Sequence, residues 1–179
     1  KELLDRLQIA FTTDAPDIDE SQVADESAHD YVLRLSLAKA RAVASRQPHS
    51  LIIASDQCCI LKGKINSKPR NHETAIQQLQ DSSGDKVSFL TGLCVLDAQT
   101  GQYQLDAIPF EVHFRTLTLD EIERYLTKEQ PYHCAGSFMV EGLGISLFKK
   151  LEGDDPTALI GLPLIRLCEM LRDFGVKLP

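Results

Sequence analysis

The sequence predicts an α/β protein, because segments of helical and of strand character alternate along the chain. Helical segments carry apolar residues three and four positions apart, whereas strand segments are continuously apolar or alternate between apolar and polar residues. The uncharged run 51–55 indicates a buried strand, and residues 87–96 and 102–115 predict a long hairpin. The 179 residues, 43% of them apolar, can bury a substantial core, so we expect one domain, in one or two lobes.

The first part of the chain is expected to contain two helices and a short strand. Residues 1–8 carry leucines at helical spacing without a capping residue in front, which indicates that the chain starts inside a helix. Residues 9–13 are a short strand candidate. An acidic loop over 14–26 then leads into a helix over 27–46, for which Ser27 is the expected N-cap.

The middle of the chain is expected to be rich in strands. The buried strand is predicted to end at Asp56, and residues 62–64 predict a turn between two short extended segments. Residues 71–80 predict a helix, and the turn-forming residues 97–101 separate the two arms of the long hairpin. In the second arm His113 belongs to the polar set of an alternating strand, so we expect it to be solvated.

The last third should contain two helices around a glycine-rich segment. The spacing predicts helices over 119–128 and 164–174, a glycine-rich segment over 136–144, and a short strand over 145–148. No repeat and no low-complexity linker marks a domain boundary.

Charge and hydropathy exclude several classes of partner. The formal net charge is −7 and no basic run occurs, which argues against a nucleic-acid groove or an anionic membrane surface. No apolar run approaches the length of a membrane span, and residues 1–6 do not resemble a signal peptide. We therefore expect a soluble, cytoplasmic protein.

The cysteines are expected to be core thiols. Their number is odd and most lie inside apolar patterns, so a disulfide framework is not expected; they are Cys58, Cys59, Cys94, Cys134 and Cys168. His133 beside Cys134 invites a nucleophile-and-base interpretation, which we disfavour because adjacent residues rarely converge on one substrate atom.

Asp56 is the first candidate for a catalytic or ligand-binding residue. An acid at the carboxyl end of a buried strand lies where open α/β sheets place their ligands. The alternative is that Asp56 only caps the turn after the strand, a common role for Asp.

Two lysines and a second acid lie in positions that could serve the same site. Lys39 interrupts the apolar stripe of its helix, so it either snorkels from the core edge or points into a cleft toward an anion. Lys68 precedes Pro69 in extended backbone and is either a surface lysine or reaches the mouth of the strand. Glu20 is either part of a solvated acidic loop or a second acid of the site. Together these residues suit polyphosphate chemistry, in which lysines neutralise phosphate oxygens and carboxylates hold Mg²⁺ or Mn²⁺.

The order of short motifs resembles that of the Maf family of nucleoside triphosphate pyrophosphatases, essentially from end to end. The matching motifs are Asp19-Glu20, Lys39-Ala40, Ser55-Asp56-Gln57, Lys68-Pro69, Thr91-Gly92, Cys134-Ala135-Gly136-Ser137-Phe138, Glu141-Gly142 and Gly161-Leu162-Pro163-Leu164. Each is weak alone, whereas their ordered combination is specific.

Within this family, Gln57 and Glu141 are similar to a subgroup that hydrolyses 7-methyl-GTP to 7-methyl-GMP and pyrophosphate. Other members usually have Thr and Gln at these places and prefer dTTP, UTP or CTP. The resemblance therefore implies house-cleaning of the nucleotide pool. A pyrophosphatase for dTTP, UTP or CTP, or a non-catalytic nucleotide-binding regulator of cell division, is the alternative.

The resemblance also implies roles for individual residues. Asp56 would be the catalytic acid, as proton acceptor for the attacking water or as metal ligand, and Glu20 would share the metal. Lys39 and Lys68 would bind phosphate. Gln57 and Glu141 would recognise the base, since a carboxylate can accept hydrogen bonds from a guanine edge and suits a ring made cationic by N7-methylation.

The implied fold is the elongated, strongly curved mixed sheet of the Maf and inosine-triphosphatase-like proteins, flanked by helices, with a cleft between two lobes. Family members begin with a strand and an S-x-S-P-x-R-R phosphate loop that is absent here, and Lys1 takes the place of the second arginine of that loop as a substrate-binding residue. Members are often homodimers.

Overall fold

The computed structural model describes residues 1–179 and confirms the α/β fold. Its helices are α1 (Glu2–Asp5), α2 (Ala28–Ala44), α3 (His72–Ser82), α4 (Leu119–Glu129) and α5 (Leu164–Asp173), with short 3-10 helices η1 (Ala135–Ser137) and η2 (Leu143–Leu147). Its strands are β1 (Leu51–Leu61), β2 (Lys64–Asn66), β3 (Lys86–Asp97), β4 (Tyr103–Phe114) and β5 (Phe148–Glu152).

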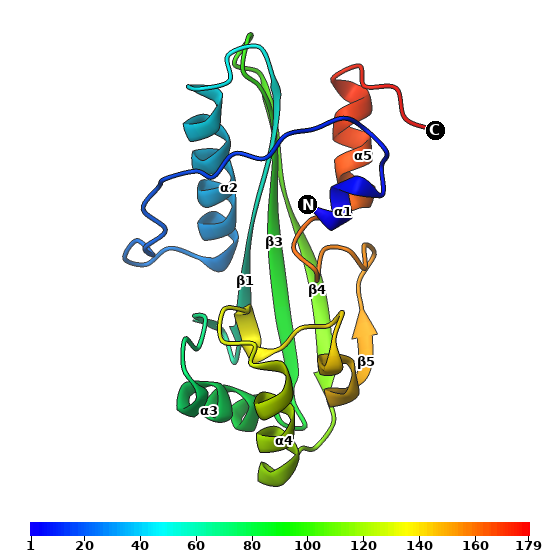
Figure 1. The fold of residues 1–179 in the computed structure, drawn as a ribbon. Coiled ribbons are helices and arrows are strands. Elements are labelled where there is room, and N and C mark those ends of the chain that lie inside the picture. The colour runs from blue at the N-terminus through cyan, green and yellow to red at the C-terminus, as the bar shows by residue number, and fades with distance from the viewer.

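The strands form one sheet in the order β2-β1-β3-β4-β5, and every neighbouring pair is antiparallel. The long strands β1, β3 and β4 run through most of the length of an elongated molecule (Figure 1). Asp56 of β1 lies directly opposite Gly92 of β3 in the register. The predicted hairpin between β3 and β4 is confirmed.

At one end the sheet is covered on both faces. Alternation along β1 and β3 turns Ile52 and Cys94 toward α2, where they pack with Ala40 and Val43. The intervening side chains of the two strands face α1 and α5. Figure 1 shows α2 on one side of the strands and α1 with α5 on the other.

The other end is dominated by a larger core on the face that also carries α5. Its helical part comes from α3 and α4, and its strand part from the ends of β1, β3 and β4. Phe138, from the glycine-rich segment, packs edge to face against Phe89, Phe114 and Phe148. The segment over 131–147 is therefore anchored in the core by an aromatic side chain.

Three helices begin at residues whose side chains cap the first turn, and one of these caps, Ser27, was predicted. Ser27 accepts a hydrogen bond from Asp30 N at 3.1 Å and caps α2 as expected. Asn71 caps α3 in the same way, and Thr118 forms a capping box with Glu121 at the start of α4.

Three expectations from the sequence are wrong. Residues 9–13 form no strand, because no strand edge pairs with them, although Ile9 and Phe11 still pack on the core beside α5. Residues 145–148 are mostly in η2, and the strand begins only at Phe148. The buried strand does not end at Asp56 but continues to Leu61 through its pairing with β3, so Asp56 lies in the middle of a strand.

The five cysteines are all free, as predicted. Cys58 and Cys59 point to opposite faces of β1, toward α2 and toward the large core respectively. None of the helices is long and apolar enough to cross a membrane.

Candidate active site

A cavity of about 330 Å³ lies beside β1 and brings together residues from four parts of the chain. Its lining includes residues 55–57 of β1, Lys68 from the loop before α3, the segment 133–141, and residues 159–161 before α5. Between residues 51 and 58 β1 has a neighbour only on its β3 side. The cavity therefore lies at an open stretch of strand edge, where groups from both faces of β1 can contribute to one site.

Asp56 and Glu20 share the ammonium group of Lys39. Lys39 Nζ lies 2.5 Å from Asp56 Oδ1 and 2.7 Å from Glu20 Oε1. The side chains of Lys39 and Asp56 are only 15% and 12% exposed, whereas that of Glu20 is 50% exposed. Lys39 therefore directs its ammonium group toward two carboxylates instead of snorkelling to solvent, and Asp56 is no turn cap.

Burial and charge shift the pKa values of these three groups in different directions. Burial raises the pKa of Asp56, and the bond from Lys39 offsets this only in part. The pKa of Glu20 is lowered, chiefly by its bond with Lys39. Burial acts to lower the pKa of Lys39, but the two carboxylates outweigh it and raise the pKa. Lys39 thus stays charged, and the surroundings of Asp56 favour its protonated form more than water does.

Lys68 faces the same cavity from the loop between β2 and α3. It is exposed and forms no ion pair within the chain. Its charge acts to lower the pKa of both Glu20 and Asp56, but this effect is smaller than that of Lys39, and burial still leaves the pKa of Asp56 raised. Lys68 is thus a cation of this site with its ammonium group available to a ligand.

Gln57 lies next to Asp56 but points to the opposite face of β1. Its Nε2 donates to Thr91 Oγ1 at 2.9 Å, to Ala158 O at 2.8 Å and to Leu159 O at 3.1 Å. Ser55, on the same face, donates to Gly161 O at 2.8 Å. These bonds attach the segment before α5 to β1, and the Gln57 side-chain oxygen keeps its capacity to accept.

The segment 133–141 supplies the far wall of the cavity. Glu141 is exposed there and takes part in no hydrogen bond or ion pair within the chain. His133 and Cys134 also line the cavity, but burial, with a contribution from Glu141, raises the pKa of the Cys134 thiol. A raised pKa leaves little thiolate at neutral pH, which agrees with the expectation that Cys134 is not a nucleophile.

A side-chain triad that the sequence did not suggest fixes the loop of Lys68. His72 Nδ1 lies 2.8 Å from the Tyr132 hydroxyl, and His72 Nε2 lies 2.8 Å from Glu123 Oε2. Arg70, held at a φ of 64°, donates its backbone N–H to Tyr132 O at 2.9 Å. The loop between Lys68 and α3 is therefore tied to α4 and to the segment that leads into the cavity wall.

Asp155 is a second residue that the sequence reading missed. It is 3% exposed and accepts hydrogen bonds from Thr157 and, at 2.7 Å, from Ile165 N. It thus caps the start of α5 from ten residues away and fixes residues 159–161 at the cavity. An isolated acid in a loop gives no sequence signal for such a role.

Lys1 is not brought to this cavity. It is exposed in front of α1, its backbone carbonyl accepts hydrogen bonds from Leu4 and Asp5, and it is absent from the cavity lining.

The donor set of Asp56 and Glu20 suits a hard divalent cation. Each carboxylate uses one oxygen for Lys39 and has its second oxygen free of hydrogen bonds within the chain. Mg²⁺ and Mn²⁺ typically bind one or two carboxylates together with waters and substrate oxygens.

A second group of ligand atoms, from Glu111, His113 and Glu152, lies within 4.8 Å of one another on β4 and β5. His113 is accordingly bonded to Glu152 at 3.2 Å rather than simply solvated, and lysines already pair with both of these carboxylates.

Comparison with known proteins agrees with the motif order. The chain matches the family model described as "Maf-like protein" over residues 1–174. Proteins named 7-methyl-GTP pyrophosphatase from Pseudomonas savastanoi pv. phaseolicola, Pseudomonas aeruginosa and Pseudomonas fluorescens are 57%, 52% and 54% identical to it over 179 residues. Each alignment covers 100% of this chain and 93% of the relative. The similarity therefore includes every part of the chain that lines the cavity.

Proposed function

Because the chain belongs to the Maf family, we propose that it is a nucleoside triphosphate pyrophosphatase that converts 7-methyl-GTP to 7-methyl-GMP and pyrophosphate. The observation that carries this proposal is the largely buried Asp56, which lines the cavity together with Lys68 and is bonded to Lys39. Lys39 also pairs with Glu20. We further propose that residues 1–179 act as one Maf-like domain and work on the nucleotide pool of the cytoplasm.

In the proposed reaction the oxygen of a water molecule attacks the α-phosphorus. A new P–O bond forms, the bond from the α-phosphorus to the α–β bridging oxygen breaks, and pyrophosphate leaves. Asp56 accepts the proton of the water, a role that its raised pKa suits. Lys39 and Lys68 stabilise the negative charge on the departing pyrophosphate.

A divalent cation, Mg²⁺ or Mn²⁺, would be held by Asp56 and Glu20 and would neutralise phosphate oxygens when bound. Lys39 holds one oxygen of each carboxylate, so this chain's own contribution is to fix the two acids before a ligand arrives.

Base selection is assigned to the other wall of the cavity. Glu141, which has no partner within the chain, is available to accept hydrogen bonds from the guanine edge and to face the positive charge of the methylated ring. Gln57, whose amide nitrogen is already bonded, would offer its side-chain oxygen to a donor group of the base.

The sharpest test is a substrate panel on the purified protein with Mg²⁺ or Mn²⁺, measuring pyrophosphate release from 7-methyl-GTP, GTP, dTTP, UTP and CTP. We expect the highest kcat/KM for 7-methyl-GTP. A preference for dTTP, UTP or CTP would transfer the proposal to ordinary nucleotides, and no pyrophosphate release from any of the five would overturn the enzymatic proposal.

Glu141→Gln is expected to lower the ratio of kcat/KM for 7-methyl-GTP over GTP by about ten-fold or more. Loss of the negative charge weakens a charge-assisted hydrogen bond worth about 1.5–3 kcal/mol and removes the attraction to the methylated ring. Glu73→Gln, at an exposed position in the first turn of α3, is the matched control and should leave the ratio unchanged. An unchanged ratio in Glu141→Gln would remove this residue from base selection.

Tyr132→Phe is expected to raise KM several-fold while changing kcat less. The variant keeps the ring but loses the hydroxyl that bonds His72, so the loop of Lys68 is held less firmly, and the free energy of unfolding should fall by about 0.5–1.5 kcal/mol. Steady-state kinetics and thermal unfolding measure both effects. Tyr103→Phe, at a site 45% exposed, is the control, and equal kinetics in the two variants would contradict a positioning role for the triad.

A further inference from the structure

A second cavity, of about 290 Å³, lies between α4 and η2 and shares no residue with the cavity of Asp56. We call it the α4–η2 pocket. Its rim carries three cationic side chains, Arg115, Arg124 and Lys128, against one acid, Glu121. A cationic pocket is unexpected on a chain with a formal net charge of −7, so the grouping of these side chains calls for an explanation.

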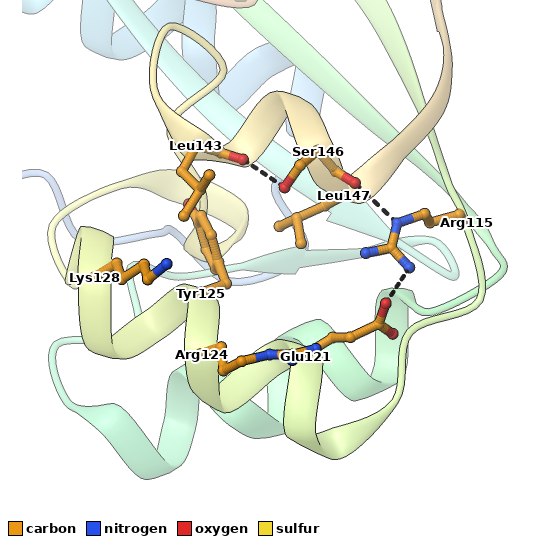
Figure 2. Close-up of a pocket in the computed structure, with 8 residues that line it drawn as sticks. All are labelled: Arg115, Glu121, Arg124, Tyr125, Lys128, Leu143, Ser146 and Leu147. Carbon is orange, nitrogen blue, oxygen red and sulfur yellow. Dashed lines mark hydrogen bonds and ion pairs between the residues drawn. The ribbon is translucent and has the colours of Figure 1, made fainter.

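Arg115 is held in place at one side of the pocket. Its Nε donates to Ser146 O at 2.8 Å and its Nη1 to Glu121 Oε1 at 2.8 Å. Its Nη2 makes no hydrogen bond within the chain. Figure 2 shows the guanidinium group between η2 and α4, with both bonds drawn. An arginine that is fixed by hydrogen bonds from Nε and Nη1 and keeps its Nη2 donors free is preorganised for an oxyanion.

Lys128 and Arg124 add positive charge from α4. Lys128 is exposed and has no ion pair within the chain. Arg124 pairs with Asp120 at 3.1 Å, but both side chains are more than half exposed, and such a pair contributes little and exchanges readily with other anions. In Figure 2 Lys128 and Arg115 flank the pocket from opposite sides. Glu121 pairs with Arg115 and Asp120 with Arg124, so Lys128 is the cation of the lining that has no acidic partner.

The inner wall of the pocket is largely apolar. Leu143 and Leu147 of η2 and the ring of Tyr125 line it. The combination suits a small molecule that presents a phosphate to the cations and a less polar part to this wall.

We propose that the α4–η2 pocket binds the phosphate group of a small metabolite, at a site separate from the cavity of Asp56. The pocket is also connected to that cavity. Tyr125 accepts a hydrogen bond from Met139 N at 3.1 Å, and Glu129 accepts one from Leu143 N at 2.6 Å. Met139 and Glu141 line the cavity of Asp56, so occupancy of the α4–η2 pocket would act on the segment that carries Glu141.

The test is a titration of the ¹⁵N-labelled protein with inorganic phosphate, followed by amide chemical shifts. We expect saturable shifts at Leu143, Ser146 and Leu147 that weaken at high ionic strength. Lys128→Glu should weaken this binding by about ten-fold or more, because a charge-assisted bond is replaced by repulsion. Lys177→Glu, which makes the same charge change at an exposed position near the C-terminus, should bind as the parent protein does.

Shifts confined to the cavity of Asp56, or equal weakening by Lys128→Glu and Lys177→Glu, would overturn the proposal. Because Lys128 lies outside the proposed catalytic cavity, Lys128→Glu should retain pyrophosphatase activity in the absence of added phosphate. A failure of the phosphate site is thereby distinguishable from a failure of the proposed enzymatic function.

Discussion

Asp56→Asn is expected to lower kcat for 7-methyl-GTP by about 10²–10⁴-fold, the usual contribution of a general base. The amide keeps the size of the carboxyl group and can still bond to Lys39, but it cannot accept the proton of the attacking water. Nucleotide binding should persist, because Lys39 and Lys68 remain. Asp154→Asn, at an exposed position with no partner, is the matched control.

The pH dependence gives an independent measure of the same role. Burial raises the pKa of Asp56, so this group is protonated at a pH at which an ordinary Asp is already ionised. As pH falls through this raised pKa, kcat/KM should fall, and the acidic limb should lie above the ordinary Asp value of about 3.9. The limb should be missing from the residual activity of Asp56→Asn.

The contribution of Asp56 to the stability of the fold should fall as pH rises, whereas its contribution to activity should rise. A carboxyl group with a raised pKa in the folded state favours folding when protonated, and this contribution is lost as pH rises through the folded pKa. At neutral pH Asp56 is ionised at a cost, so Asp56→Asn should unfold at the same or a slightly higher temperature than the parent protein. Unchanged turnover in this variant would refute the catalytic role, and a loss of turnover caused only by unfolding would appear as a lowered Tm.

Gly92→Ala is expected to cost about 3 kcal/mol of folding free energy and to lower Tm by about 6–12 °C. A Cβ at this position would lie 2.4 Å from Val32 O and 2.6 Å from Ser36 Oγ, both on α2. The nearest atom is a backbone atom, so relief requires a shift of the helix. Gly92 therefore permits the close approach of α2 to β3, opposite Asp56 in the register.

Activity should fall in Gly92→Ala even at temperatures where the variant is folded, because a displaced α2 carries Lys39 away from Asp56. Gly101→Ala is the control. A Cβ there meets no atom within 4 Å, and only the left-handed φ of 75° opposes it, at a cost of about 1–2 kcal/mol. If Gly92→Ala were no more destabilising than Gly101→Ala, the close-approach explanation would fail.

Local patterns predicted most of the secondary structure correctly. The cap Ser27, the helical spacing of α2 to α5, and the β3–β4 hairpin all depend on neighbouring residues, which a sequence displays directly. Residues 9–13 show the limit of such patterns, since they have strand composition but no strand edge to pair with.

The site was predicted less completely, because its geometry depends on long-range pairing. The acid at position 56 suggested the end of a strand, but Lys39 offsets the cost of its burial and β3 continues the pairing beyond it. The triad of Glu123, His72 and Tyr132 joins residues far apart in sequence, so no spacing could reveal it. Asp56 and Gln57 are adjacent in the sequence, but alternation directs them to opposite faces of β1.

Because the side chains of Asp56 and Gln57 lie on opposite faces of β1, substitutions at these two adjacent positions affect different surroundings. A substitution at position 57 acts on Thr91 and on the backbone of Ala158 and Leu159, whereas the ion pair of Asp56 with Lys39 lies on the other side of the strand. If the proposed roles hold, the two neighbouring positions can therefore diverge independently, with Gln57 changing the accepted nucleotide while Asp56 keeps its part in phosphate cleavage. A deletion of one residue within β1 would instead exchange the two faces and abolish both properties at once.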